Sequence, residues 1–253
     1  MISFNDLVVG FKKLGLKQKD IVLVHSSFKS FGGVMGGPQT VIDALCYVIT
    51  DMGTLIVPTF NFNFCEGEPF DVMNTPSQMG VITELVRKNP NSKRTLHPVY
   101  SFSIMGKLRD TLSNLNYESS YGKDSIFAKL RDLDGKIMII GLPYNKSMTF
   151  FHHIEEMEGC DYRYFKEFKG QITDYRDTKE GKAIIFVRDL ERGVITQVDK
   201  MGKILEKEKI VSIQKIGNSV VRLMKVNDVY KRTVQEMKKN PHILCEIHST
   251  NLK

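Results

Sequence analysis

The stretch Asp20-Ile-Val-Leu-Val-His-Ser-Ser27 decides the fold. Its four consecutive apolar residues predict a strand that is buried on both faces. A loop with four glycines then leads to Pro38, a residue favoured in the first turn of a helix, and the helix is expected to run to about Thr50. Thr54 to Pro58 predicts the next strand. This order of strand, helix and strand indicates a βαβ unit and parallel strands with covered faces.

Apolar spacing extends this pattern along the chain. It predicts helices at 5–14, 80–88 and 126–131, and strands at 99–105 and 136–140. Strands are expected at 183–189 and 194–198, a further candidate strand at 211–216, and mostly helix over 218–239. The predicted class is α/β, with a central mainly parallel sheet flanked by helices and a smaller β-containing elaboration in the C-terminal third. We expect a single domain over 1–253, with a sub-structure at about 162–208.

The composition is that of a soluble globular protein, because 42% of the 253 residues are hydrophobic and 26% are charged. No apolar run reaches the length of a membrane span, and the N-terminus lacks the features of a secretory signal. The cysteines are scattered and match no metal-binding spacing; they are Cys46, Cys65, Cys160 and Cys245. We therefore expect a cytoplasmic protein without a disulfide framework, a bound metal or a membrane partner.

The net charge is +7, and much of the excess lies in 200–209 and 225–239. Such runs are explained by a solvated basic face or by attraction to an anionic ligand such as a nucleotide or coenzyme. No helix-turn-helix, RRM or zinc-finger pattern is present, so no nucleic-acid partner is expected.

Thr149-Phe-Phe-His-His-Ile-Glu155 places His152 three residues before Glu155. The stretch follows the predicted strand 136–140 and a short loop, which puts both residues on one face at the start of a helix. A histidine oriented by a carboxylate is a candidate general base. A surface ion pair without a catalytic role explains the same pattern.

Other polar groups lie where strands are expected to end. His25-Ser26-Ser27 and the glycine loop offer hydroxyl and N–H groups to a pyrophosphate or pantetheine, although plain turn chemistry also explains the glycines. His97 before Pro98 suits a buried structural histidine. Ser125 suits a helix cap as well as a ligand contact. The irregular segment 59–79 is long for an idle loop.

In this order the pieces resemble the aminoglycoside 3-N-acetyltransferase family, which is distinct from the GNAT acetyltransferases. The resemblance covers about 20–170 and rests on seven motifs in sequence. They are His25-Ser26-Ser27 with Gly36-Gly37-Pro38, Gly53 to Thr59, Arg94 with His97-Pro98 and Ser101-Phe102, Tyr121-Gly122 with Ser125, Asp134-Gly135-Lys136, Thr149 with His152 and Glu155, and Tyr162-Arg163 with Lys166.

The resemblance implies acyl transfer from acetyl-CoA, or another acyl-CoA, to an amine. It implies that His152 is the general base, that Glu155 is its partner and that Thr149 lines the same site. The coenzyme contacts it implies are His25, Ser26, Ser27, Lys29, Ser30, Val34, Ser101, Phe102 and Ser103. The acceptor contacts are Asn61, Asn63, Glu66, Tyr121 and Glu156. The chain departs from the family at Phe150, where many relatives carry a small polar residue, and at 61–71.

The acceptor is a small-molecule amine. The positive net charge of the chain favours a nucleotide-linked amino sugar, used for surface glycan synthesis, because the phosphates of such a sugar are anionic. The alternative is an aminoglycoside, in a resistance enzyme. A catalytically silent CoA-binding or scaffold protein is a further alternative. A serine or cysteine hydrolase is not indicated, since no Gly-x-Ser-x-Gly elbow is present. The sequence leaves the oligomeric state open, a homo-oligomer included.

Overall fold

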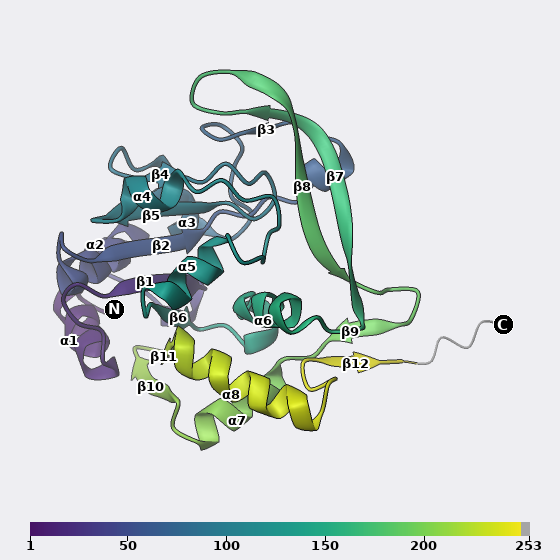
Figure 1. The fold of residues 1–253 in the computed structure, drawn as a ribbon. Coiled ribbons are helices and arrows are strands. Elements are labelled where there is room, and N and C mark those ends of the chain that lie inside the picture. Colours follow the sequence, from purple (N-terminus) through teal and green to yellow (C-terminus); the bar gives the residue numbers. More distant parts are fainter. Residues whose placement is uncertain (249–253) are drawn as a thin grey trace.

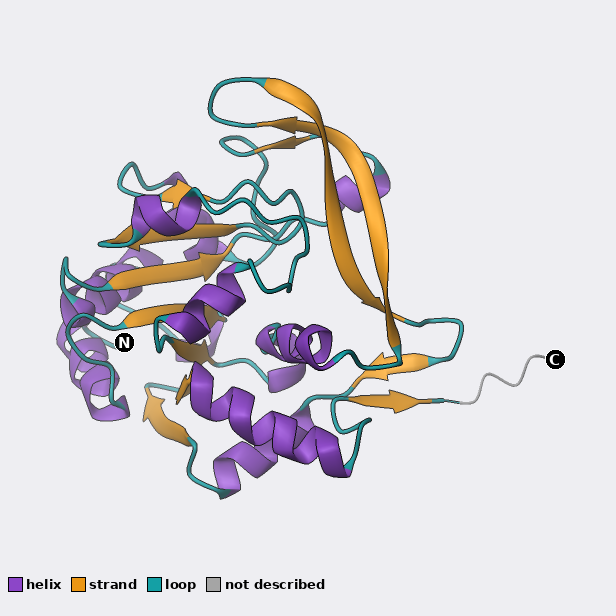
Figure 2. Cartoon of the chain, viewed as in Figure 1, coloured by secondary structure: helices purple, strands orange, loops and turns teal. Residues whose placement is uncertain are grey.

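The computed structural model describes residues 1–248, which form three layers with a central sheet between two groups of helices (Figures 1 and 2). The sheet has seven strands in the order β10-β11-β6-β1-β2-β5-β4. The α/β class is therefore confirmed.

The three middle strands of the sheet are parallel. They are β1 (Ile21–Ser26), β2 (Thr54–Pro58) and β6 (Lys136–Ile140). Leu23 of β1 pairs with Ile56 of β2 on one side and with Ile137 of β6 on the other. The helix α2 (Pro38–Ile49) connects β1 to β2, with Pro38 in its first turn. The predicted βαβ unit is confirmed.

Both edges of the sheet are antiparallel, so the sheet is mixed and its parallel part is confined to the centre. On one side β2 pairs with β5 (Phe102–Gly106), and β5 pairs with β4 (Lys93–Arg94). On the other side β6 pairs with β11 (Ser219–Lys225), and β11 pairs with β10 (Val211–Ile216).

The prediction of helix over 218–239 is wrong in its first part, because residues 219–225 form β11. Val221 and Leu223 are buried while Val220 is exposed, which is the period-two pattern of a strand. Gly217 makes the tight turn from β10 at φ +57°. Only the second part is helical, as α8 (Val226–Lys239).

The two faces of the sheet carry different helices. Alternate residues of β1 face opposite sides: Val22 and Val24 pack with one buried cluster, and Leu23 packs with the other. The first cluster is covered by α1 (Phe4–Leu14), α2 and α3 (Val81–Lys88). The second is rich in aromatic residues and is covered by α5 (Ile126–Asp132), α6 (Phe150–Glu158), α7 (Asp199–Lys207) and α8.

A long hairpin of β7 (Arg163–Thr173) and β8 (Thr178–Arg188) stands beside the helical layer (Figure 1). Its C-terminal part overlaps the predicted strand 183–189, whereas β7 was not predicted. Most residues of β7 are exposed or partly exposed, so the strand lacks the apolar alternation by which strands are recognised. The hairpin lies within the sub-structure expected at about 162–208.

Short elements complete the chain. β3 (Phe70–Asp71) pairs with β7, and β9 (Val194–Thr196) pairs with β12 (Cys245–Ile247). The remaining helical turns are η1 (Phe28–Phe31), η2 (Asn63–Glu66), α4 (Arg109–Ser113) and η3 (Tyr144–Lys146). No helix in residues 1–248 is both long and apolar enough to cross a bilayer.

A pair of glycines tests the packing of the central sheet. Gly106 and Gly15 have nearly the same positive φ, +101° and +104°. A methyl group at Gly106 would press on the backbone carbonyl of Gly53, whereas at Gly15 it would meet nothing. We expect Gly15→Ala to cost about 1–2 kcal/mol in the free energy of unfolding. Gly106→Ala should cost about 1–3 kcal/mol more, because the clash is added to the strain. Urea denaturation of both variants measures the difference, and equal losses would contradict the packing.

Candidate active site

Helix α6 begins a short distance after the carboxyl end of β6. The N–H of His152 donates to the carbonyl of Thr149 over 2.9 Å, so the first turn starts there, although the Thr149 side chain makes no capping bond. Phe150, Phe151 and Ile154 are fully buried and anchor the helix to the sheet. The departure from the family at Phe150 therefore falls on a core position.

His152 and Glu155 touch, as their spacing predicts. Nδ1 of His152 lies 2.7 Å from Oε2 of Glu155. The hydroxyl of Tyr162 donates to Oε1 of the same carboxylate over 2.9 Å. Nε of Arg163 lies 2.8 Å from Oε2, and Nη2 lies 2.9 Å from Nδ1 of His152. The Glu155 side chain is fully buried, while the His152 side chain keeps 18% of its surface exposed.

This environment favours a neutral imidazole next to an ionised carboxylate. Burial lowers the pKa of His152, and the Arg163 guanidinium lowers it further, against the opposing effect of Glu155. Burial alone would raise the pKa of Glu155, but His152 and Arg163 together hold it below its usual value. Nε2 of His152 makes no hydrogen bond to a residue in 1–248. The histidine can therefore accept a proton at that nitrogen.

Two predicted acceptor residues lie close to His152. The Tyr121 ring is buried, with its centroid 5.4 Å from that of His152. Glu156 follows one turn of helix after His152, and its carboxylate accepts the hydroxyl of Ser119 at 2.7 Å and 2.8 Å. Burial raises the pKa of Glu156. Glu156 lines a cavity of about 590 Å³ together with Glu118, Asp124 and one lysine, Lys123. With three carboxylates and one lysine, the lining of this cavity is acidic.

The predicted coenzyme residues at the end of β1 form a connected turn. The Ser30 hydroxyl donates to the carbonyl of Ser27 over 2.6 Å and lies 2.8 Å from the hydroxyl of Ser219. His25 is buried, and its Nε2 has no hydrogen-bond partner in 1–248. Ser26 is partly exposed and Lys29 is exposed, while Val34 is buried and bridges to Ile2. His25 to Ser30 therefore offer polar groups at and just after the carboxyl end of the central strand β1, and Val34 offers only its backbone.

Ser101, Phe102 and Ser103 are fully buried and present no side chain at the surface. The Ser101 hydroxyl accepts from Nε of Arg94 at 2.9 Å, and the Phe102 ring packs edge-on against Phe127. Their coenzyme contacts remain a prediction from the resemblance. In this structure Phe102 packs in the core, and Ser101 holds the Arg94 side chain by a hydrogen bond.

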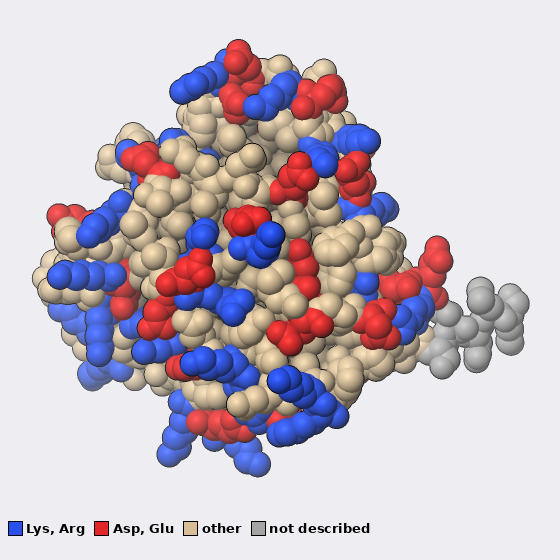
Figure 3. Space-filling model, in the orientation of Figure 1, with Lys and Arg blue, Asp and Glu red and all other residues tan. Residues whose placement is uncertain are grey.

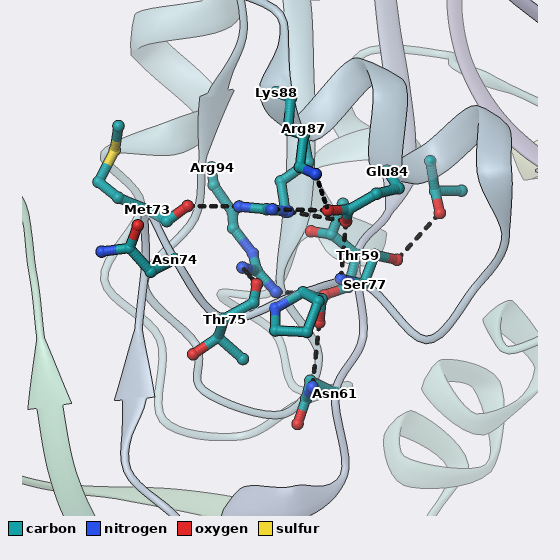
Figure 4. Close-up of polar contacts among 12 residues, drawn as sticks. Thr59, Asn61, Met73, Asn74, Thr75, Ser77, Glu84, Arg87, Lys88 and Arg94 are labelled. Carbon is teal, nitrogen blue, oxygen red and sulfur yellow. Dashed lines mark hydrogen bonds and ion pairs between the residues drawn. The ribbon is translucent and has the colours of Figure 1, made fainter.

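Arg94 holds the irregular segment 59–79 to the sheet (Figure 4). Nη2 donates to the carbonyl of Thr59 over 2.6 Å, and Nη1 donates to the carbonyl of Thr75, so one guanidinium joins both parts of the segment. Burial lowers the pKa of Arg94 to about 9. Glu84 and Arg87 of α3 form an ion pair that also binds the segment, through Ser77 and Met73 respectively.

The other predicted acceptor residues lie on this segment. Nδ2 of Asn61 donates to the carbonyl of Pro76 over 3.0 Å (Figure 4). Oδ1 of Asn63 accepts from the side chain of Gln78 at 2.8 Å. Glu66 is exposed on η2. Asn61 thus serves the loop itself, and none of the three lines the cavity beside Glu156.

Sequence reasoning did not place Tyr162 and Arg163 in the site. In the sequence they stand out only as part of a family-like motif, although they contact Glu155 directly. The one sequence feature that points to these contacts is Gly159. It adopts φ +64° at the end of α6 and makes the short turn that brings the start of β7 back against the helix. Residues three or four apart share a face within a helix, but this rule does not relate residues on the two sides of such a turn.

The sequence profile described as aminoglycoside 3-N-acetyltransferase matches residues 23–238. The chain belongs to this family. It is 30% identical over 241 residues to the prophage-derived aminoglycoside N(3')-acetyltransferase-like protein YokD of Bacillus subtilis, covering 86% of this chain and 85% of that protein. It is 26% identical over 244 residues to aminoglycoside N(3)-acetyltransferase IV of a Salmonella species, covering 94% and 88%.

Solved structures share the fold. The AAC-IIIb complex with CoASH has a TM-score of 0.84 at 20% identity, covering 94% of this chain and 96% of that one. YokD of Bacillus subtilis has a TM-score of 0.81 at 26% identity, covering 94% of both chains. The chain therefore has the fold of these structures and, as a member of the aminoglycoside 3-N-acetyltransferase family, is an N-acyltransferase, as expected.

The preference for a nucleotide-linked amino sugar is not supported, and the comparisons favour the aminoglycoside alternative. The reason lies in where the charge is. Lys and Arg gather along the lower edge of the molecule, around α7 and α8 (Figure 3), whereas three carboxylates and one lysine line the cavity beside Glu156. The net charge of the whole chain does not report the charge of a site.

Buried histidines make stability depend on pH. Burial lowers the pKa of His25, His97 and His153 to about 4, from an unfolded value near 6.5. The unfolded chain therefore binds more protons between these values, and stability present above pH 6.5 is lost as pH falls toward 4. We expect the free energy of unfolding to fall by several kcal/mol in order of magnitude across this window. Urea titrations at stepped pH measure it.

His97 provides the control. Its Nδ1 accepts the N–H groups of Val99 and Tyr100, and its Nε2 lies 3.1 Å from the hydroxyl of Ser120, which confirms a structural role. His97→Gln should make the pH dependence shallower. Stability that does not change between pH 6.5 and 4.5 would show that these histidines are not held neutral.

Proposed function

We propose that this chain transfers an acetyl group from acetyl-CoA to the 3-amino group of an aminoglycoside, with His152 as the general base. The observation that carries the proposal is the contact of Nδ1 with the buried Glu155 carboxylate, which leaves Nε2 free. Membership of the aminoglycoside 3-N-acetyltransferase family supports the donor and the class of acceptor.

The chemistry follows from the protonation states. An ammonium has no lone pair, so it cannot attack a thioester until it loses a proton. Nε2 of His152 takes a proton from the ammonium, and the neutral amine attacks the acetyl carbon. The C–S bond then breaks, the sulfur of CoA takes up the further proton that the attacking nitrogen loses and leaves as the thiol, and His152 later gives its proton to solvent. Glu155 holds the imidazole in place and stabilises the positive charge that forms on it. General-base help of this kind contributes about 10²–10⁴-fold to the rate.

The acceptor is proposed to bind in the cavity that Glu118, Asp124 and Glu156 line. An aminoglycoside carries several ammonium groups, and these carboxylates would balance them. Glu156 lies one turn of α6 from His152, so an ammonium bound near it brings a second amine within reach of the base. Tyr121 fixes the ring of His152 by contact.

The coenzyme is proposed to lie along the end of β1. The donor set there fits its chemistry: partly exposed serines at Ser26, Ser27 and Ser30, the unpartnered Nε2 of His25, and the exposed ammonium of Lys29. Hydroxyls and N–H groups suit the amides of pantetheine, and lysine suits phosphate. We further propose that 1–253 act as one acyltransferase domain, since Arg163 of the hairpin contacts α6.

His152→Ala should lower kcat by at least about 100-fold, because the base is lost while the substrates still bind. The dissociation constant for CoA should change less than a few-fold. CoA thiol release from acetyl-CoA is recorded with a panel of aminoglycosides and, in parallel, with nucleotide-linked amino sugars. Release with the second panel alone would overturn the proposed acceptor, and full activity of His152→Ala would overturn the proposed base.

Glu156→Gln should raise KM for the aminoglycoside about tenfold with a smaller change in kcat, because a carboxylate that binds an ammonium is removed. The amide keeps the shape and can still accept from Ser119. Glu66→Gln is the comparison, since Glu66 lies outside the cavity and is exposed. An effect confined to Glu66→Gln would move the acceptor to the segment 59–79.

A further inference from the structure

We infer that Arg163 is a positioning residue for the transfer, because it holds Glu155 as the ionised acceptor of the Nδ1 proton and so keeps Nε2 of His152 as the basic nitrogen. This inference rests on the proposed function only in taking His152 as the base. It assigns a role to a residue of the hairpin that lies outside the helix carrying the reacting pair.

Three groups surround the guanidinium, and two of them hold it: the Phe186 carbonyl by a hydrogen bond and the Glu155 carboxylate by an ion pair. Nη1 donates to the carbonyl of Phe186 on β8 over 2.9 Å, Nε lies 2.8 Å from Oε2 of Glu155, and Nη2 lies 2.9 Å from Nδ1 of His152. Only 5% of the Arg163 side chain is exposed, and none of the Glu155 side chain is. Water therefore cannot take the place of either charge, and each ion is the counter-ion of the other.

Nδ1 of His152 has two neighbours that make opposite demands. Glu155 requires a proton on Nδ1, whereas Nη2 of Arg163 would donate to a lone pair there. A lone pair at Nδ1 would face a buried carboxylate oxygen at 2.7 Å, which is a repulsion between two acceptors. As long as Glu155 stays ionised, the proton therefore resides on Nδ1 and the lone pair on Nε2.

His152 and Arg163 together keep Glu155 ionised, and Arg163 is the partner that stays charged while the imidazole is neutral. A carboxylate buried without a cation would gain a proton and lose its ability to accept from Nδ1. The same guanidinium, next to the imidazole, disfavours a second proton on the ring before the substrate supplies one. The pair of Glu155 and Arg163 is neutral in sum, so the imidazole is neither held as a cation nor left without an orienting partner.

Among residues 1–248, no other buried group that acts on this cluster can replace the guanidinium. Burial raises the pKa of Tyr100, Tyr121, Cys160, Tyr162 and Cys245, so all five are neutral near pH 7. Arg188 of β8 is exposed and acts on His152 in the same direction as Arg163, but Arg163 acts more strongly. Arg163 is thus the buried cation on which the proton arrangement depends.

The experiment compares Arg163→Gln, which removes the charge but can still donate a hydrogen bond, with Arg163→Lys, which keeps the charge. The pH dependence of kcat/KM is measured for both. With Arg163→Gln the acidic limb of the kcat/KM profile should move about one pH unit higher. At pH values below the limb, kcat/KM should therefore fall about tenfold. With Arg163→Lys the limb should stay near that of the wild type while kcat falls. Arg192→Met, a change at an exposed arginine paired with Asp161, is the control and should leave the limb in place.

A second readout does not need an acceptor. NMR of the imidazole nitrogens reports the pKa and the tautomer of His152, which is assigned by its absence in His152→Gln. The wild type should carry its proton on Nδ1, and Arg163→Gln should raise the pKa of His152. Glu155→Gln should lower the pKa of His152. Arg163 then donates to Nδ1, the proton moves to Nε2, and activity is lost at all pH values.

An unchanged pKa in Arg163→Gln, or a proton that stays on Nδ1 in Glu155→Gln, would overturn the role of Arg163. If Arg163→Gln does not fold, Arg163→Lys and Glu155→Gln still decide it. Wild-type protein that releases no CoA with any acceptor would refute the proposed function instead, and the NMR results would stand apart from that failure.

Discussion

The buried carboxylate of Glu155 is the constraint on which the site depends. A charge removed from water must find a counter-ion and hydrogen-bond donors in the protein, or it is neutralised. Glu155 finds them in three places, at His152 on its own helix, and at Tyr162 and Arg163 at the start of β7. The helix and the start of the hairpin meet at this group. The His152 ring is therefore oriented by two elements that are separated by a turn.

The same need for partners shapes the other end of the hairpin. The hydroxyl of Tyr175, in the turn between β7 and β8, accepts from the N–H of Arg94 and donates to its carbonyl, each over 2.8 Å. The Arg94 side chain in turn holds the segment 59–79 through carbonyl oxygens and Ser101. This buried guanidinium forms no ion pair with a carboxylate of residues 1–248, so it fixes the loop through the carbonyl oxygens that satisfy its donors. The hairpin is thus anchored at its base by Arg163 and at its tip by Arg94.

Electrostatics near the site differ from those of the whole molecule. The chain carries a net charge of +7, yet three carboxylates and one lysine line the cavity beside Glu156. Much of the excess positive charge belongs to α7 and α8, where Arg232 already pairs with Glu208 and Glu236. Exposed charges act over about a Debye length of roughly 8–10 Å, so the local carboxylates govern which amine is attracted.

The sequence by itself determined the βαβ core, the helix that starts at Thr149 and the contact of His152 with Glu155. These features depend on local periodicity and on the i, i+3 geometry of a helix, which adjacent residues express directly. Only the tertiary structure decided that residues 219–225 form a strand, that Ser101 supports Arg94, and that Arg163 meets His152 and Glu155. Those outcomes require a partner from a distant segment, such as β6 for β11 and α6 for β7. The position of such a partner is a property of the packed chain, and no local pattern encodes it.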